Sequence, residues 1–455
     1  SSDLTMQSAA EAVEVSGSWS GMRKLGFFSQ INYEWQKKYF VSGTMRYDGS
    51  SRFGADNRMG FFPSISAGWD IARENFLEKA AWINQLKLRV GYGVTGNDQI
   101  NNVSSRGFYQ GGTSYNGNAG INLQTMANTH LGWEKNISTN IGVDFSVLNE
   151  RIYGSVDVFR RISKDLLLDM VLPYTSGFGS IDRNAGKLRN QGLELELNTV
   201  NIRQRDFKWT TSFNITFLDN KVIELYDGLD FISNTIRVGH PLTIWYRPRY
   251  AGVNSANGRP MWYDANGNIT YLLTAADNVP TSKGWQSEYF GGLNNTFSYK
   301  NFELSTLFHY DMGRYMANNQ LQVLTNVMNN AARNTLRELY EKRWTTPGQV
   351  TSVPRLIAGG AEFNSTAHTS TSTRYLEDAS FIRLREVTLA YRFSPKQITK
   401  LRLSAARIYV TAVNLYTWTA WTGYDPEFAI GGSVEGNQGI IPQTRSITAG
   451  IQVSL

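Results

Sequence analysis

The sequence predicts an all-β fold, a transmembrane antiparallel β-barrel. Three observations carry this prediction: strict alternation at the C-terminus, strand-like segments along the whole chain, and connections that alternate between short and long. Residues 444–455 alternate apolar and polar side chains without a break, so one strand face is apolar and the other is small and polar. The apolar positions are Ile447, Ala449, Ile451, Val453 and Leu455. This is the pattern of a barrel strand that lies between lipid and water.

The composition agrees with a barrel and excludes several other classes. Hydrophobic residues make up 41% of the 455 residues and charged residues only 18%. The chain has no run of about 18 apolar residues that could form a transmembrane helix. It has no cysteine, which excludes disulfides and thiolate metal sites. The net charge of +7 is scattered rather than clustered, so we predict no nucleic-acid partner. We expect the cations to meet outer-membrane lipid and lipopolysaccharide at strand ends, or solutes inside a pore.

Strand-like segments recur about thirteen times along the chain. The alternation slips in phase between Leu384 and Val387, which predicts a β-bulge. The predicted strands are residues 25–35, 39–47, 61–69, 86–94, 137–148, 151–164, 193–198, 209–217, 285–299, 302–312, 380–393, 402–415 and 444–455.

The connections between these strands are sorted by length. Short links fall near residues 36, 149, 203, 300 and 397, with a medium one at 71–83. Bacterial barrels have short periplasmic turns and long extracellular loops, so we predict that the C-terminal strand runs toward the periplasm. The predicted long extracellular loops are residues 96–134, 166–189, 220–284, 314–378 and 416–443.

The odd number of strands predicts that the barrel is incomplete within this chain, because single-chain bacterial barrels have an even number. The chain also opens without an initiator Met or a signal segment. We therefore expect residues 1–455 to be the C-terminal part of a barrel, with further strands supplied from upstream or by another chain.

Two loop segments carry structure of their own. Apolar residues near helical spacing predict a helix within residues 320–344. The segment from Trp262 to Tyr271 reads as a hairpin around Asn266 and Gly267.

No motif predicts catalysis, a cofactor or a metal. Residues 91–96 read GYGVTG, but a polar loop rather than a helix follows, so small residues on a strand explain the pattern better than a dinucleotide site. Four histidines are scattered, and neither a nucleophile elbow nor a P-loop is present. The carboxylates of Glu194 and Glu196 could mimic a hydrolase pair but fit a water-filled lumen better.

Strand parity identifies candidates for the inner wall, provided that no bulge reverses the faces. The lumen-facing candidates are Arg46, Lys87, Arg89, Asp144, Glu194 and Glu196. A second set of aromatic residues lies in or beside the long loops, where the rings could contact substrate or a lid, or simply stiffen the loops. We favour stiffening for this set, which is Trp245, Tyr246, Trp262, Tyr263, Trp418 and Trp421.

An ordered set of motifs resembles the SusC/RagA family of TonB-dependent outer-membrane transporters of the Bacteroidota. Each motif is weak alone, but together they span nearly the whole chain in the expected order. The longest match is residues 374–391 (RYLEDASFIRLREVTLAY). The others are residues 47–54 (YDGSSRFG), 62–64 (FPS), 67–69 (AGW), 86–97 (LKLRVGYGVTGN), 190–197 (NQGLELEL), 414–419 (NLYTWT) and 423–427 (GYDPE), with Pro442 and Arg445.

The resemblance implies a plugged barrel of about 22 strands in the cell outer membrane. It further implies a SusD-like surface lipoprotein as a lid, TonB acting through an N-terminal segment, and import of oligosaccharides or peptides. The plug domain and the TonB-binding segment are not within these residues, and Leu455 stands where the family usually ends on an aromatic residue. The alternative is a SusC-like scaffold barrel that does not transport but serves a larger outer-membrane assembly.

Overall fold

A computed structural model describes residues 20–115, 118–233, 236–325, 336–356, 372–398, 403–427 and 441–454. Its main feature is one antiparallel sheet of 13 strands, in which each strand pairs with the next wall strand along the chain. The wall strands are β1 (Lys24–Trp35), β2 (Tyr39–Ser50), β3 (Met59–Asp70), β4 (Ile83–Asn97), β7 (Glu134–Val147), β8 (Ile152–Lys164), β11 (Lys187–Arg203), β12 (Phe207–Glu224), β20 (Tyr289–Tyr299), β21 (Phe302–Met312), β24 (Phe381–Arg392), β25 (Ala405–Thr419) and β26 (Ser446–Ser454).

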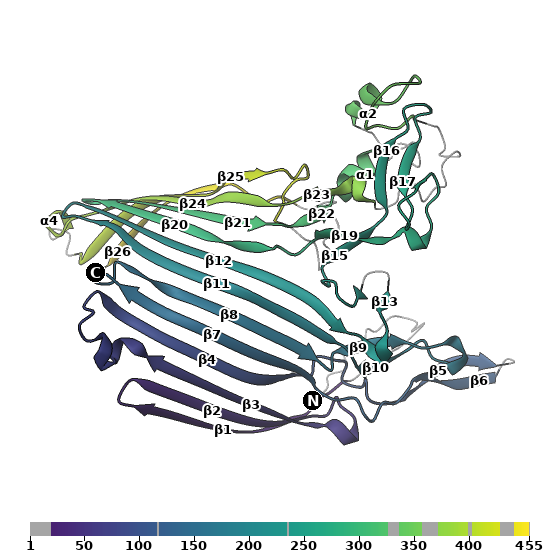
Figure 1. Ribbon diagram of the computed structural model, residues 1–455, viewed down its shortest axis with the longest axis horizontal. Helices are drawn as coiled ribbons and strands as arrows, with labels where there is room; N and C mark the ends of the chain where they lie inside the picture. Colours follow the sequence, from purple (N-terminus) through teal and green to yellow (C-terminus); the bar gives the residue numbers. More distant parts are fainter. Residues whose placement is uncertain are drawn as a thin grey trace, which may run out of the picture.

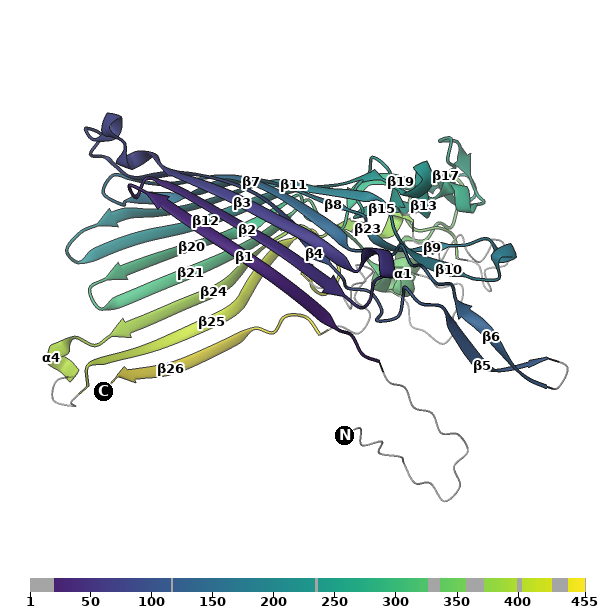
Figure 2. The same cartoon turned by 90° about the horizontal axis from the view of Figure 1, so that it is seen from below.

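The sheet is strongly curved, with β1 and β26 at its two edges (Figures 1 and 2). Short turns gather at one end of the strands, beside α4 (Pro395–Ile398), and the long connections gather at the other end (Figure 1). This is the predicted separation of short and long links. The sheet is the wall of a partial barrel, which confirms the predicted fold class.

The two faces of the wall differ as the alternation predicts. On β26, Ile447 and Ile451 are each 75% exposed on one face, which we call the apolar face. Cross-strand pairs continue that face along the sheet: Val410 lies opposite Ala449, and Ile408 opposite Ile451. The other face carries the small and polar residues of each strand, and we call it the polar face. Large exposed hydrophobic side chains on one side of a sheet are stable when lipid covers them.

Local details also follow the sequence. A bulge interrupts the pairing of β24 between Leu384 and Glu386, where the phase of the alternation slips. The turn from β1 to β2 needs positive φ at both central residues, and Gln36 and Lys37 adopt φ of 52° and 54° there. The predicted hairpin is present as β17 (Pro260–Tyr263) paired with β18 (Ile269–Thr270).

The long connections contain short strands and helices that the sequence mostly did not predict. The predicted helix within 320–344 is two short helices, α1 (Asn319–Thr325) and α2 (Arg337–Lys342), and residues 326–335 between them lie outside the described part. Among the described residues, no helix is both long and apolar enough to cross a bilayer. The loop strands are β5 (Phe108–Tyr115), β6 (Asn118–Thr125), β9 (Leu167–Val171), β10 (Ser180–Asn184), β13 (Phe231–Ser233), β14 (Ile236–Arg237), β15 (Ile244–Arg247), β16 (Arg249–Val253), β19 (Val279–Gly284), β22 (Tyr315–Ala317) and β23 (Leu376–Asp378).

Candidate functional site

The six charged residues selected by parity all lie on the polar face. Lys87 is opposite Asp144 in the pairing of β4 with β7, and Glu194 and Glu196 continue the same face on β11. Arg46 lies on that face of β2, where its guanidinium pairs with Asp48 at 3.1 Å. The face is thus polar and charged over several neighbouring strands, and it can offer hydrogen bonds and charges to a solute.

An ion-pair cluster joins three of these strands. The guanidinium of Arg89 donates two hydrogen bonds of 2.8 Å to the two carboxylate oxygens of Asp144, and a third of 3.0 Å to Asp157 on β8. Bidentate arginine–carboxylate pairs are strong and fix geometry. Space for the guanidinium exists because Gly142 has no side chain: a Cβ there would lie 2.8 Å from the Arg89 Nη2 atom. The cluster therefore cross-links the wall rather than leaving three free charges.

Other charges on the polar face remain available to a solute. The ammonium of Lys87 lies 4.4 Å from the centre of the Phe40 ring, and among the described residues no carboxylate is within ion-pair distance of it. It borders a hollow of about 490 Å³ that also includes Asn32, Glu34 and Asn140.

A second hollow of about 440 Å³ adjoins the first at Asn140. It is lined by Phe159, Arg161, Asn190 and Glu194. Each hollow combines an aromatic ring, a cation, a carboxylate and side-chain amides, and its size is in the range of small-molecule sites.

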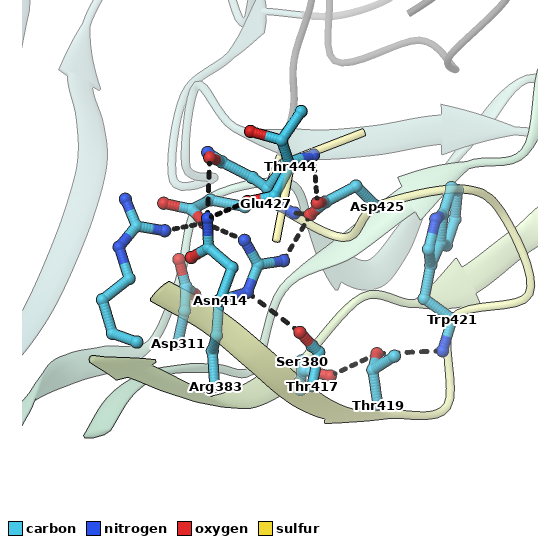
Figure 3. Close-up of polar contacts among 12 residues, drawn as sticks. Asp311, Ser380, Arg383, Asn414, Thr417, Thr419, Trp421, Asp425, Glu427 and Thr444 are labelled. Atoms are coloured by element: carbon cyan, nitrogen blue, oxygen red, sulfur yellow. Dashed lines mark hydrogen bonds and ion pairs between the residues drawn. The ribbon is translucent and has the colours of Figure 1, made fainter. Parts of the chain in front are cut away.

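At the end of β24 that meets the long connections, the buried Arg383 holds the segment that follows β25 (Figure 3). Its guanidinium donates to Asp425 at 2.6 Å, to Glu427 at 2.7 Å and to the hydroxyl of Thr417 at 3.0 Å. The second oxygen of Asp425 accepts a hydrogen bond from the backbone N–H of Gln443 at 3.1 Å. Since Arg383 is only 1% exposed, its positive charge is shielded from water and needs these partners. The cluster fixes both ends of the loop 420–443 to the wall.

A second set of contacts joins the loops that follow β12, β21 and β25. Glu377 accepts hydrogen bonds from the Asn318 amide and from the backbone and hydroxyl of Thr422. The indole N–H of Trp245 donates to the Tyr315 carbonyl at 2.7 Å. These contacts connect three loops that are far apart in the sequence.

The loop aromatics divide by burial. Trp245, Tyr246, Trp262 and Trp421 are 3–7% exposed, so their rings pack within the loops and present no open face to a ligand. Their burial favours stiffening. The other two, Tyr263 and Trp418, are exposed, and Trp418 lies on the apolar face of β25 opposite Ile382.

The motif YDGSSRFG forms the end of β2 and the start of its connection to β3. Phe53 is fully buried against Trp133, 5.0 Å between ring centres, and Gly54 approaches the backbone of Thr129 so closely that a Cβ would lie 1.8 Å from its carbonyl oxygen. Beside it, the carboxylate of Asp98 pairs with Lys24 at 2.8 Å. Burial alone raises the pKa of Asp98, but hydrogen bonds from Lys24 and Ser50 outweigh it and hold the pKa below 3.8.

Several residues of these clusters escaped the sequence reasoning. Asp157 alternates in the same way as Asp144, so parity could have identified it. Arg383, Asp425 and Glu427 stood inside quoted motifs, but their pairing bridges more than 40 residues and leaves no local pattern. In the described part of the chain, no group of three or more His, Asp or Glu side chains is arranged to hold a metal ion.

Comparison with known proteins places this chain among TonB-dependent receptor β-barrels. The family described as TonB dependent receptor-like, beta-barrel matches residues 14–415. TonB-dependent receptor P26 of Formosa agariphila is 31% identical over 96% of this chain and 46% of its own length. TonB-dependent receptor SusC of Bacteroides thetaiotaomicron is 30% identical over 95% of this chain and 43% of its own length.

A solved structure, that of the RagAB peptide transporter, is also similar. It superposes with a TM-score of 0.84 at 30% identity, covering 95% of this chain and 48% of that chain. The chain thus spans about half the length of the relatives that it matches.

Proposed function

Because the chain belongs to the SusC/RagA family of TonB-dependent outer-membrane β-barrels, we propose that it forms part of the wall and mouth of an importer for oligosaccharides or peptides. In this proposal the apolar face lies in the lipid of the outer membrane. The polar face lines the import route, and the long loops at the extracellular end receive substrate and a SusD-like lipoprotein lid. TonB acts through the part of the family's architecture that these residues do not include.

The observation that supports import best is the chemistry of the polar face. Its two adjoining hollows share Asn140 and present cations, carboxylates, amides and a ring in each. Such groups can bind and release a polar solute repeatedly, since none of them is individually strong. A wall that served only as a scaffold would not need charges such as Lys87 and Glu194 on this face, which have no ion-pair partner among the described residues.

Uptake by the bacterium that encodes the protein tests the proposal. Deletion of the gene should reduce growth on, or uptake of, one class among a panel of oligosaccharides and peptides. Uptake should also stop when the proton gradient is collapsed. Complementation with the full-length Lys87→Gln/Glu194→Gln variant should restore less uptake than the wild type at equal protein level in the outer membrane.

The controls separate import from a scaffold. The control variant Glu78→Gln/Lys79→Gln, at two exposed positions in the connection between β3 and β4, should complement fully. Native purification should bring down one surface lipoprotein. The scaffold would be established instead if uptake survived deletion of the gene and a large multiprotein assembly dissociated in the deletion strain.

A further inference from the structure

Three lysines lie directly opposite one another at the extracellular end of the apolar face. Lys135 on β7 pairs in register with Lys164 on β8, and Lys164 pairs with Lys187 on β11. Residues paired in this way have Cα atoms roughly 5 Å apart. Like charges directly opposite on a sheet are destabilising. An arrangement of three therefore requires counter-charge from somewhere.

Other cations extend this row into a patch over four adjacent strands. Arg160 and Arg189 lie on the same face of β8 and β11, and Lys221 is opposite Arg189 on β12. We call the six the basic patch: Lys135, Arg160, Lys164, Lys187, Arg189 and Lys221. The strands β7, β8, β11 and β12 run side by side, and this is the end that bears the long loops (Figure 1).

The chain itself supplies too few carboxylates for the basic patch. Glu224 pairs with Lys187, and Asp219 pairs with Arg189 at 2.9 Å. Within the described residues, no carboxylate is within ion-pair distance of the other four cations. Four positive charges are thus left for an external anion.

An apolar row begins immediately below the patch. Ile141, Val158, Leu193 and Phe217 lie opposite one another in register and are 37–55% exposed. Along β8 the row is two residues, about 7 Å, from Arg160, and on β11 and β12 it is four residues from Arg189 and Lys221. The patch and the row together match a molecule with an anionic head and hydrocarbon chains.

We propose that the basic patch binds the phosphate groups of lipid A, the membrane anchor of lipopolysaccharide, while its acyl chains lie against the apolar row. The extracellular leaflet of an outer membrane is where the long loops emerge. A second copy of the chain is a poor occupant, because a two-fold contact through this patch would bring the same cations together. The inference depends on the membrane location and not on import.

Lipid binding by the purified full-length protein tests this site. Native mass spectrometry in a neutral detergent would measure retention of added lipid A, with enzymatically dephosphorylated lipid A and phosphatidylglycerol as comparison probes. The test variant is Lys135→Gln/Arg160→Gln/Lys164→Gln. We expect roughly 100-fold weaker binding of lipid A after removal of three cations. Binding should also weaken at high salt.

The matched control is Arg161→Gln, because Arg161 is the next residue of the same strand but its register, and its contact with Ser138, place it on the polar face. It should bind lipid A as the wild type does. Heat-dependent gel mobility confirms that each variant is a folded barrel. If the triple variant does not fold, lipid A binding by the wild type that does not weaken with salt would overturn the proposal. Equal binding by the triple variant, by dephosphorylated lipid A or by phosphatidylglycerol would overturn the proposal.

Discussion

The wall strands are joined by backbone ladders, whereas the long loops are joined by buried side chains. β25 and β26 pair over nine residues, yet every residue of β26 except Gly450 is exposed among the described residues. By contrast, the loop residues Trp245 and Trp421, and Arg383 at the end of wall strand β24 that meets the loops, are 1–7% exposed and contact segments distant in sequence. A wall side chain therefore contributes mainly through the medium that it faces, and a loop side chain through its specific partners. Substitutions should separate the two regions.

Arg383→Met should have the largest effect. It removes the arginine that pairs with the buried Asp425 and one of the two that pair with Glu427, which keeps Arg385 at 2.8 Å; breaking a buried pair from one side costs about 3–5 kcal/mol. We expect faster proteolysis within 420–443 and a lower free energy of unfolding in detergent. The wall comparison is Ile451→Ala, which is 75% exposed on the apolar face and should cost less than about 1 kcal/mol. Equal losses for the two variants would contradict the distinction.

The sequence predicted the wall strands and the hairpin at 262–271 because both depend on local patterns, and it missed the contacts between distant segments at the loop end. Alternation is a local pattern, so thirteen strands and the bulge beside Leu384 could be predicted from neighbouring residues alone. The shared face of Arg89 and Asp144 likewise follows from parity. By contrast, the pairing of Arg383 with Asp425 depends on how two distant segments fold together. A sequence shows both residues, but neither spacing nor composition joins them.

Two glycines provide a matched pair across the regions. Gly54 has ordinary extended angles, φ −61° and ψ 162°, so only the space near Thr129 requires glycine. Gly54→Ala should cost roughly 1–3 kcal/mol, because the backbone around the buried Phe53 must shift. Gly43→Ala on β2 has nothing within 4 Å of the added Cβ and should be neutral. Differential scanning calorimetry of both purified variants measures the two changes in stability. A neutral Gly54→Ala would show that the space near Thr129 does not require glycine.

In the middle of the wall, Arg89 differs from its neighbours, because its side chain has specific ion-pair partners. Its side chain is 37% exposed, so we expect Arg89→Gln to cost only about 1 kcal/mol of unfolding free energy. A double-mutant cycle with Asp144→Asn should show a coupling of similar size. Lys87→Gln, which loses a ring contact rather than an ion pair, should couple to Asp144 much less. Absence of coupling between Arg89 and Asp144 would show that this ion pair does not stabilise the wall beyond its backbone hydrogen bonds.

Asp98 should give the smallest effect, and it appears only in acid. Burial raises its pKa, but the Lys24 and Ser50 hydrogen bonds hold the net pKa in the folded protein below 3.8. Its stabilising contribution is therefore complete at neutral pH, and it is lost as the pH falls through the folded pKa. The Asp98→Asn variant should melt at a lower temperature than the wild type at neutral pH, and the gap should narrow as the pH falls through the folded pKa of Asp98. Glu78→Gln, at an exposed position between β3 and β4, should change the acid profile much less. A gap that persists undiminished in acid would show that Asp98 acts through packing rather than through its charge.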